Sequence, residues 1–378
     1  MKFIHLSDLH LGKRIYETSL IEDQQYILGQ ILNIIDEEKP DGVLIAGDIY
    51  DKSFQPVDAM KLFDDFLNEL HNRSLSIFII SGNHDSADRV AFASQIMSNQ
   101  KIHLAPAYQG KIHSIDLKDD FGSLHIYMLP FVKKALVKSL YPDEPIETTT
   151  DALKCVIDHT ELNENDRNVL IAHQFVTGSA ASGSEEYTVG GADNVDAYVF
   201  DVFDYVALGH IHGPQYVSRE TIRYCGTPLK YSFSEVNHEK SVTMVELREK
   251  GNTEVRTIPL TPLRDMRDIK GTYYDLMSKE EYQNTNRDDY IRAILTDEND
   301  VPDAIARLRT VYPNILTLDY DNQRTRQKVD FTEAADVEKK TPYDLFAEFF
   351  EQRNGRPMDT DQEKLVKELI QKIWEEEA

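Results

Sequence analysis

The chain has 378 residues, of which 41% are hydrophobic and 28% charged, an ordinary composition for a folded protein that excludes wholesale disorder. Lys and Arg number 41 against 66 Asp and Glu, and the formal net charge of −25 excludes a uniformly basic coat for nucleic acid. A local basic patch, or contact through metal ions, is still compatible with it. The two cysteines, Cys155 and Cys225, are too few for a disulfide framework or a structural zinc site. No signal peptide or membrane-spanning apolar run is recognisable, so we expect a cytoplasmic protein without a membrane partner.

The first half of the sequence alternates short apolar runs with stretches of helical spacing. Strands are predicted at residues 3–6, 43–46 and 75–80, and helices at 20–37 and from Pro56 onward. This β-α-β-α-β order is typical of parallel strands joined by crossover helices. Further strands are predicted at 124–129, 169–172, 205–208, 221–225 and 242–247. Because few helices separate these later strands, we expect an α/β core with two sheets.

Changes in composition indicate the domain boundaries. A Pro-rich stretch at 259–262 ends the first predicted domain, residues 1–262. Residues 263–325 are predicted to form a small α+β domain, with a helix at 302–311 and a strand at 315–318. Residues 326–378 are predicted to be a polar linker and two amphipathic helices. Thr341 is the expected N-cap of the first helix, and Thr360 with Glu363 the expected capping box of the second.

Five short polar motifs stand at or just beyond predicted strand ends. They are Asp8-Leu9-His10, Gly47-Asp48, Gly82-Asn83-His84-Asp85, Ala172-His173 and Gly209-His210-Ile211-His212. The carboxyl ends of strands in α/β sheets converge on one crevice, so these side chains can meet there. Imidazole and carboxylate donors together favour Mn, Fe or Zn over Mg or Ca, and two such ions can clamp a phosphate. The motifs therefore predict a dinuclear metal centre.

The ordered set of motifs resembles the calcineurin-like metallophosphoesterase superfamily. The segments SDLHLGKR, AGDIYD, SGNHDS, ALGHIH and YCGTPLKYSFSE are similar to the bacterial SbcD subfamily, the nuclease subunits of the SbcCD DNA-processing complex. The resemblance extends over nearly the whole chain. It implies a two-sheet metallophosphoesterase core, a small α+β capping domain and a C-terminal helical tail.

The resemblance also implies roles for individual residues. One metal ion would be held by Asp8, His10, Asp48 and His212, and the other by Asp48, Asn83, His173 and His210, with Asp48 as the bridge. His84 would contact the scissile phosphate, and Asp85 would orient the His84 ring, although capping the next helix is the alternative for Asp85. Asp51 stands where relatives often have His, so its role is left open.

The activity implied by the resemblance is that of a DNA nuclease with two Mn²⁺ ions, for which other divalent transition metals are alternatives. Double-strand 3′–5′ exonuclease, single-strand endonuclease and hairpin-opening activities are implied, in DNA repair, recombination and replication near the nucleoid. Two other functions are alternatives: an enzyme of the same superfamily acting on phosphomonoesters or cyclic nucleotides, and a metal-depleted binding scaffold. The complete set of seven ligands disfavours the scaffold, and the extra domain and tail disfavour a small substrate.

The partner implied by the resemblance is SbcC, an SMC-like ATPase with a long coiled coil, in an assembly containing a homodimer of this chain. The chain has no Walker A sequence, so ATP hydrolysis would belong to that partner. The tail helices are predicted to dock on it, with packing on this protein's own core as the alternative. Candidate DNA contacts are Lys13, Arg14, Arg89 and Lys230, for which solvated surface positions are an equal alternative. A Gly/Ser-rich loop at 177–191 is predicted to be flexible, or to become ordered over DNA.

Overall fold

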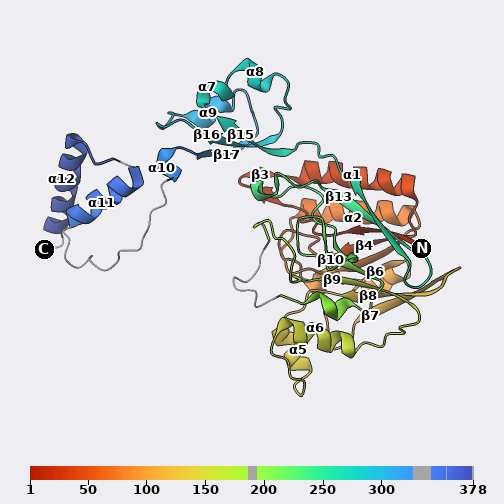
Figure 1. Ribbon diagram of the computed structural model, residues 1–378. Coiled ribbons are helices and arrows are strands. Elements are labelled where there is room, and N and C mark those ends of the chain that lie inside the picture. Colours follow the sequence, from red (N-terminus) through yellow and green to blue (C-terminus); the bar gives the residue numbers. More distant parts are fainter. Residues whose placement is uncertain (186–193, 327–341, 355, 377–378) are drawn as a thin grey trace. The chain divides into compact units, whose positions relative to one another are not determined.

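The computed structural model describes residues 1–185, 194–326, 342–354 and 356–376, and the chain divides into two compact units, Met1–Met266 and Arg267–Ala378 (Figure 1). None of the helices in these described ranges is both long enough and apolar enough to cross a lipid bilayer.

The first unit contains two six-stranded sheets. The first sheet has the order β14-β13-β1-β4-β5-β6. Its strands are β1 (Lys2–Leu6), β4 (Gly42–Ala46), β5 (Ser76–Ile80), β6 (Ile102–Leu104), β13 (Ser241–Leu247) and β14 (Thr253–Pro259). β1, β4, β5 and β6 run parallel, while β13 is antiparallel to both of its neighbours. The parallel strands are nearly continuous apolar runs because both faces of this sheet are covered.

The second sheet has the order β11-β12-β10-β9-β8-β7. Its strands are β7 (His113–Asp119), β8 (Gly122–Leu129), β9 (Arg167–His173), β10 (Tyr205–Gly209), β11 (Gln215–Val217) and β12 (Arg219–Tyr224). β8, β9, β10 and β12 run parallel. The short strands β2 (Arg14–Ile15) and β3 (Thr18–Ser19) pair outside both sheets.

Helices cover the outer face of each sheet. In Figure 1, α1 (Ile21–Glu38) and α2 (Val57–Asn72) lie on one side of the strands, and α5 (Lys134–Leu140) and α6 (Thr149–Asp158) on the other. Between the sheets, buried side chains from β1, β4 and β5 pack against those of β8, β9 and β10. The remaining helical turns of this unit are α3 (Ala87–Val90), α4 (Ser94–Ser98), η1 (Ala197–Phe200) and η2 (Phe233–Glu235). The predicted two-sheet α/β core is confirmed.

The second unit begins with a three-stranded sheet of order β15-β16-β17. Its strands are β15 (Met266–Gly271), β16 (Tyr290–Leu295) and β17 (Ile315–Tyr320). The helices of the unit are α7 (Tyr273–Leu276), α8 (Lys279–Tyr282), α9 (Ala304–Leu308), α10 (Gln323–Arg326), α11 (Pro342–Asn354) and α12 (Thr360–Glu376). Apolar residues of the three strands, α7 and α9 form a separate small core.

Two helix starts differ from the sequence expectations. The helix expected at 302–311 is shorter in the structure, where α9 covers Ala304–Leu308. It begins at Ala304 because Asp303, directly before it, adopts a left-handed conformation with φ of 53°. The capping box of α12 lies one residue earlier than expected. The Asp359 carboxylate accepts the backbone N–H of Gln362, and the Gln362 side chain accepts that of Asp359. The predicted cap Thr341 lies outside the described residues.

Candidate metal centre

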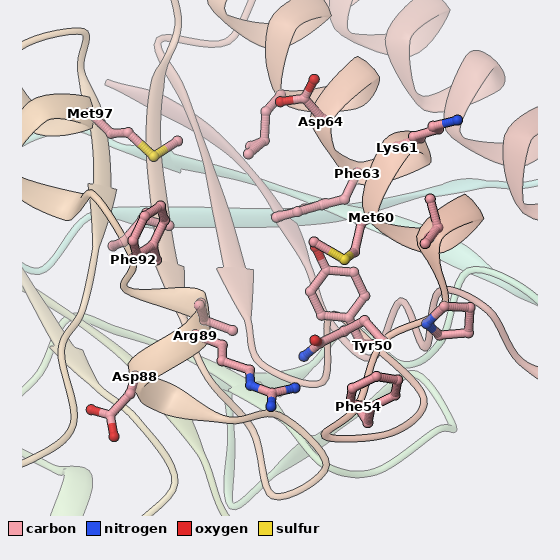
Figure 2. A pocket seen from close by; sticks show the side chains of 16 residues that line it. Tyr50, Phe54, Met60, Lys61, Phe63, Asp64, Asp88, Arg89, Phe92 and Met97 are labelled. Atoms are coloured by element: carbon pink, nitrogen blue, oxygen red, sulfur yellow. The ribbon is translucent and has the colours of Figure 1, made fainter.

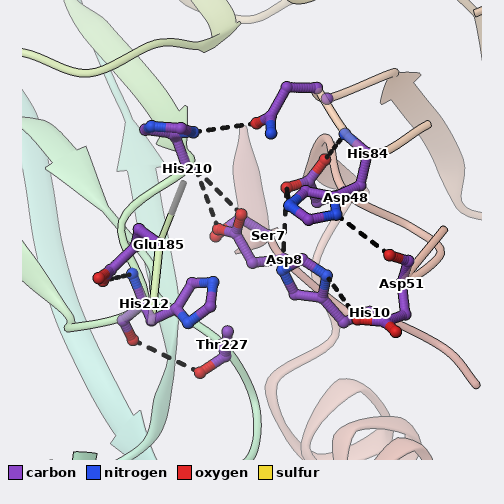
Figure 3. A network of polar contacts seen from close by, with 12 residues as sticks. Ser7, Asp8, His10, Asp48, Asp51, His84, Glu185, His210, His212 and Thr227 are labelled. Atoms are coloured by element: carbon purple, nitrogen blue, oxygen red, sulfur yellow. Dashed lines mark hydrogen bonds and ion pairs between the residues drawn. The ribbon is translucent and has the colours of Figure 1, made fainter. Parts of the chain in front are cut away.

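The seven predicted ligands lie at or directly after the carboxyl ends of β1, β4, β5, β9 and β10, and the structure brings all of them together. Figure 3 labels Asp8, His10, Asp48, His210 and His212 among them. Four non-glycine residues among them have positive φ angles: Asp8 at 52°, His10 at 43°, Asp48 at 47° and His210 at 104°. Such conformations cost about 1–3 kcal/mol each and persist only where the surroundings impose them. Their concentration at one sheet edge is typical of a functional site.

Backbone hydrogen bonds fix the loops that carry these residues. The N–H of Asp8 donates to the Gly47 carbonyl at 3.0 Å, and that of His10 donates to the Asp48 carbonyl at 2.9 Å. The loops after β1 and β4 are thereby joined. The N–H of His210 donates to both carboxylate oxygens of Asp8, at 3.0 and 3.2 Å, which joins the two sheets.

Asp48 lies at the centre of the cluster. Its Oδ2 atom is 3.4 Å from Nε2 of His173 and 3.8 Å from Nε2 of His10, and the residue is only 2% exposed. Burial alone would raise the pKa of Asp48, but the charge and hydrogen bond of His173 lower it below its usual value. The carboxylate is therefore ionised and faces histidines on two sides.

Two sets of donor atoms flank Asp48. On one side, Asp8, His10 and His212 each present a donor atom within 4.8 Å of the others. On the other side, Oδ1 of Asn83 lies 3.0 Å from Nε2 of His173 and 3.0 Å from Nδ1 of His210. Nδ1 of His173 also lies 2.8 Å from the Ala46 carbonyl oxygen, which accepts a hydrogen bond from the Nδ1–H group. Nε2 of the same ring therefore faces the cluster.

The donor set fits a divalent metal centre. His10 is 1% exposed, yet neither of its ring nitrogens has a hydrogen-bond partner, which is unusual for a buried imidazole. Burial lowers the pKa of His10 and, together with the charge of His173, lowers that of His210 to about 3. Both rings are therefore neutral, with lone pairs available. Neutral imidazoles beside carboxylates and an amide oxygen are suitable ligands for a transition-metal dication.

His84 and Asp85 differ from one another in their relation to the cluster. Nε2 of His84 lies 4.0 Å from Oδ2 of Asp48, and the side chain is 21% exposed. Its Nδ1 lies 3.1 Å from the Asp51 carbonyl oxygen, which orients the ring. The contacts of Asp85 differ from the expected contact with this ring. The Asp85 carboxylate instead accepts backbone N–H groups from Ile49, Tyr50 and Gly82, and so joins the loops after β4 and β5.

The predicted basic residues have different surroundings. Nζ of Lys13 pairs with Oδ1 of Asp51 at 2.7 Å, next to His10. Arg14 and Arg89 are exposed, Arg14 donating to the Glu17 carbonyl and Arg89 to that of Ser53.

Lys230 is the exception among the four basic candidates. Its ammonium group pairs with Asp265 and donates to two backbone carbonyls, so all of these contacts hold it to its own chain.

Two glycines of the motifs are required by close packing at the site. A Cβ atom at Gly209 would lie 1.9 Å from the Ala46 carbonyl oxygen and 2.7 Å from Nδ1 of His173. A Cβ atom at Gly82 would lie 2.1 Å from Oδ1 of Asp48. Both contacts are shorter than real Cβ atoms show, so these positions exclude larger residues regardless of backbone angle.

Several buried polar residues that the sequence analysis did not single out support the ligands. Nε2 of Gln24 on α1 donates to the His10 carbonyl at 2.7 Å, and the Tyr231 hydroxyl donates to the Leu9 carbonyl at 2.5 Å. Glu235 lies 3.1 Å from Nδ1 of His212. The only sequence signal for Gln24 is a polar residue on the inner face of an apolar helix.

Comparison with known families agrees with this geometry. Residues 1–214 match the calcineurin-like phosphoesterase family, which is more than half of the chain. The fold and the site thus define a metal-dependent phosphoester hydrolase of that class. Residues 262–354 match a second family, described as the type 5 capsule protein repressor C-terminal domain and designated SbcD_C.

Two curated relatives match over the full length of the chain, and both are named as the D subunit of the SbcCD nuclease. The relative from Staphylococcus epidermidis is 30% identical over 100% of both chains. The relative from Staphylococcus saprophyticus is 31% identical over 100% of this chain and 99% of that one. The chain belongs to this SbcD family of nuclease subunits. Among solved structures, a dimetal phosphatase from Danio rerio is 12% identical with a TM-score of 0.41, over 69% of this chain and 98% of that one.

Proposed function

We propose that the chain is a manganese-dependent DNA nuclease and the SbcD component of an SbcCD-like complex. Its activities are double-strand exonuclease in the 3′–5′ direction, single-strand endonuclease and hairpin opening, in DNA repair, recombination and replication at the nucleoid. Full-length relatives named as nuclease subunits support this proposal. The observation that carries it is the buried Asp48 carboxylate, with histidines of two ligand sets on either side.

Each metal position has a distinct set of protein groups. Asp8, His10, Asp48 and His212 would hold the first ion, and Asp48, Asn83, His173 and His210 the second. Bound at these positions, two Mn²⁺ ions would supply Lewis-acid polarisation of a phosphodiester and activation of water. Mn²⁺ suits the mixture of imidazole and carboxylate donors.

The protein itself contributes a proton-transfer group and a rigid frame. The partly exposed ring of His84 directs Nε2 towards the cluster, while the Asp51 carbonyl holds Nδ1. This position suits protonation of the leaving oxygen or contact with the developing charge on the phosphate. Asp85 holds the loops on which Asp48 and His84 stand at a fixed separation. Among the four candidate DNA contacts, Lys13 and the exposed Arg14 and Arg89 are the proposed binding groups for the DNA backbone.

A second copy of the chain is the proposed partner of an apolar groove close to the site. The groove, of about 1150 Å³, is lined by side chains of the loop after β4, of α2 and of the α3–α4 region, including Phe54, Met60 and Phe92 (Figure 2). Phe92 is 80% exposed and Ile96 73% exposed, and neither α3 nor α4 contains a buried residue. Apolar surface of this kind marks a protein interface. The resulting homodimer would bring two metal centres into one assembly.

The C-terminal helices are the proposed binding site for the SbcC-like ATPase. α11 and α12 contact one another, with Nζ of Lys367 4.5 Å from the Tyr343 ring centre. Large apolar side chains of both helices stay exposed: Phe346 at 42%, Phe349 at 48%, Leu365 at 57% and Leu369 at 50%. The proposed organisation is a nuclease domain at 1–262, a small domain at 263–325 and a linker with the partner-binding tail at 326–378.

An assay with several substrates tests the proposed activity. Purified chain, with and without its ATPase partner, is given linear duplex, hairpin DNA and p-nitrophenyl phosphate esters in the presence of Mn²⁺. Cleavage of DNA with little turnover of the small monoester is the expected result. Efficient turnover of the small esters without DNA cleavage would instead identify a phosphatase of the same family.

A further inference from the structure

His212 is held at both its backbone and its ring by one short segment of the chain. The segment is 182–185, the described end of the Gly/Ser-rich stretch that follows β9. The backbone N–H of His212 donates to Oε1 of Glu185 at 2.9 Å, a contact visible in Figure 3. Nδ1 of the same residue lies 2.9 Å from Oγ of Ser184. Part of the loop predicted to be flexible, or to become ordered over DNA, therefore contacts a proposed metal ligand directly.

The contacts of the His212 ring select one tautomer. Oγ of Ser184 donates to Oε1 of Glu235 at 2.7 Å, and it lies 2.6 Å from Oγ of Ser182, which can donate to it. The carboxylate oxygen Oε1 of Glu235, at 3.1 Å from Nδ1 of His212, can only accept, and with its proton directed at Glu235 the Ser184 hydroxyl likewise accepts from Nδ1. With its proton on Nδ1, the ring presents the lone pair of Nε2 to the cluster, as a metal ligand must.

Glu235 is itself fixed by a buried cation. Lys240 is 6% exposed, and its ammonium group donates at 2.6 Å to Oε2 of Glu235, at 2.6 Å to Oγ1 of Thr227 and at 2.9 Å to the His212 carbonyl oxygen. It also lies 3.4 Å from Nδ1 of His238. All three of its protons are thus used. Because Glu235 is 0% exposed, its carboxylate cannot turn to water and stays directed at His212 and Ser184.

The two proposed metal positions differ in the groups that orient their histidine ligands. The ring of His173 is oriented by a main-chain carbonyl, that of Ala46. The ring of His212 is oriented by two side chains, and one of them stands on the segment 182–185. The position served by His212 is therefore the one directly linked to that segment in the described part of the chain.

We propose that Ser184 and Glu235 are positioning residues for His212, and that docking of segment 182–185 on His212 sets the affinity of the metal position it serves. The inference rests on the proposed dinuclear centre. Partners of this type change metal affinity by about 10–100-fold when they are removed. The affinity of the second position, with its main-chain support, should be unaffected.

The experiment measures Mn²⁺ binding to the metal-free full-length chain by titration calorimetry and by electron paramagnetic resonance. Ser184→Ala removes one acceptor for Nδ1, and Ser184→Thr restores the hydroxyl. Ser179→Ala is the matched control, because Ser179 lies in the same loop and donates to the Val176 carbonyl. A double variant, Glu235→Gln with Lys240→Met, removes the buried charge pair without leaving an unpaired charge.

We expect two Mn²⁺ equivalents for the wild type, Ser184→Thr and Ser179→Ala. In Ser184→Ala, one of the two dissociation constants should rise about 10-fold or more, with loss of the spin-coupled signal at low Mn²⁺ and no change in melting temperature without metal. The double variant should show the same weakening more strongly.

Two Mn²⁺ equivalents bound to Ser184→Ala as tightly as to the wild type would overturn the inference, even if the double variant did not fold. Fewer than two equivalents bound to the wild type would overturn the dinuclear centre, and the inference with it.

Discussion

The carboxylate of Asp8 accepts the backbone N–H of His210, 202 residues later in the chain, at 3.0 and 3.2 Å. Asp8 follows β1 of the first sheet and His210 follows β10 of the second, so this contact closes the carboxyl ends of the two sheets onto one another. Burial raises the pKa of Asp8 to about 6, while the charge of His173 opposes the rise and that of Asp48 adds to it. A bound cation next to this buried carboxylate would stabilise its ionised form, as expected for a metal ligand.

Replacing Asp48 with Ala should abolish metal loading and hydrolysis together. The Asp48 carboxylate lies within 4 Å of histidines from both ligand sets, at 3.4 Å from His173 and 3.8 Å from His10. Mn²⁺ content by elemental analysis and DNA cleavage are the measurements. Asp36→Ala, which removes an exposed carboxylate paired with Arg73, is the control and should keep both properties. Two bound Mn²⁺ ions in Asp48→Ala would contradict the assignment of the bridge.

His84→Ala should leave metal binding and DNA binding intact, while the rate of hydrolysis falls by about 10²–10⁴. The reason is the position of the ring, which is partly exposed and oriented by a main-chain carbonyl, with Nε2 4.0 Å from Asp48. Single-turnover cleavage and Mn²⁺ titration separate the two effects. Because His10, Asp48 and His84 also form a possible donor set, loss of one Mn²⁺ in this variant would make His84 a ligand instead.

Gly209→Ala should weaken metal binding and destabilise the fold, by about 1–3 kcal/mol. The added methyl group would meet the Ala46 carbonyl oxygen at 1.9 Å and Nδ1 of His173 at 2.7 Å, and so break the hydrogen bond that orients His173. Gly29→Ala in α1 is a control with the opposite sign. Apart from its two chain neighbours and the backbone of its own helix, no atom lies within 4 Å of a Cβ there, and the helix should gain about 0.5–1 kcal/mol. Chemical denaturation measures the free energy of unfolding of the two variants, and Mn²⁺ titration measures their metal affinity. A Gly209→Ala chain with wild-type stability and metal affinity would refute this packing argument.

Phe92→Asp should convert a dimer into a folded, metal-binding monomer. Phe92 is 80% exposed in the isolated chain, so a charge there costs the chain's own core little but would be buried in a dimer that uses the apolar groove. Light scattering after gel filtration reports the mass. Tyr274→Asp, at an equally exposed aromatic (81%) in the second unit, should leave the dimer unchanged. A Phe92→Asp chain that stays dimeric would place the interface elsewhere.

Truncation after Lys340 should leave a nuclease that binds Mn²⁺ and nicks single-stranded DNA but does not co-purify with its ATPase partner. Leu369→Asp, on the exposed side of α12, should have the same effect on assembly in the full chain, whereas the neighbouring Glu368→Ala should not. Normal assembly of the truncated chain would refute the docking of the tail. A large drop in its melting temperature would show that the helices cover this protein's own core.

The sequence by itself determined the strand–helix order of residues 1–80 and the set of chemical groups at the strand ends. Long apolar runs such as those of β4 and β9 are readable because strands covered on both faces are apolar throughout. Strands at the sheet edges cannot be recognised in this way. β7 and β14 alternate exposed charged residues with half-buried ones and carry little apolar signal, and neither was predicted.

Only the tertiary structure decided which groups act on one another. Asp85 bonds backbone groups of two loops, Lys230 is held to its own chain, and Glu235 orients His212 from 23 residues away. Local sequence contains no signal for such contacts, because each depends on the separation that the packed sheets impose between distant strand ends. The motifs specify the types of ligand residue. The orientation of the ligand side chains follows from buried hydrogen bonds that form only when the two sheets pack together.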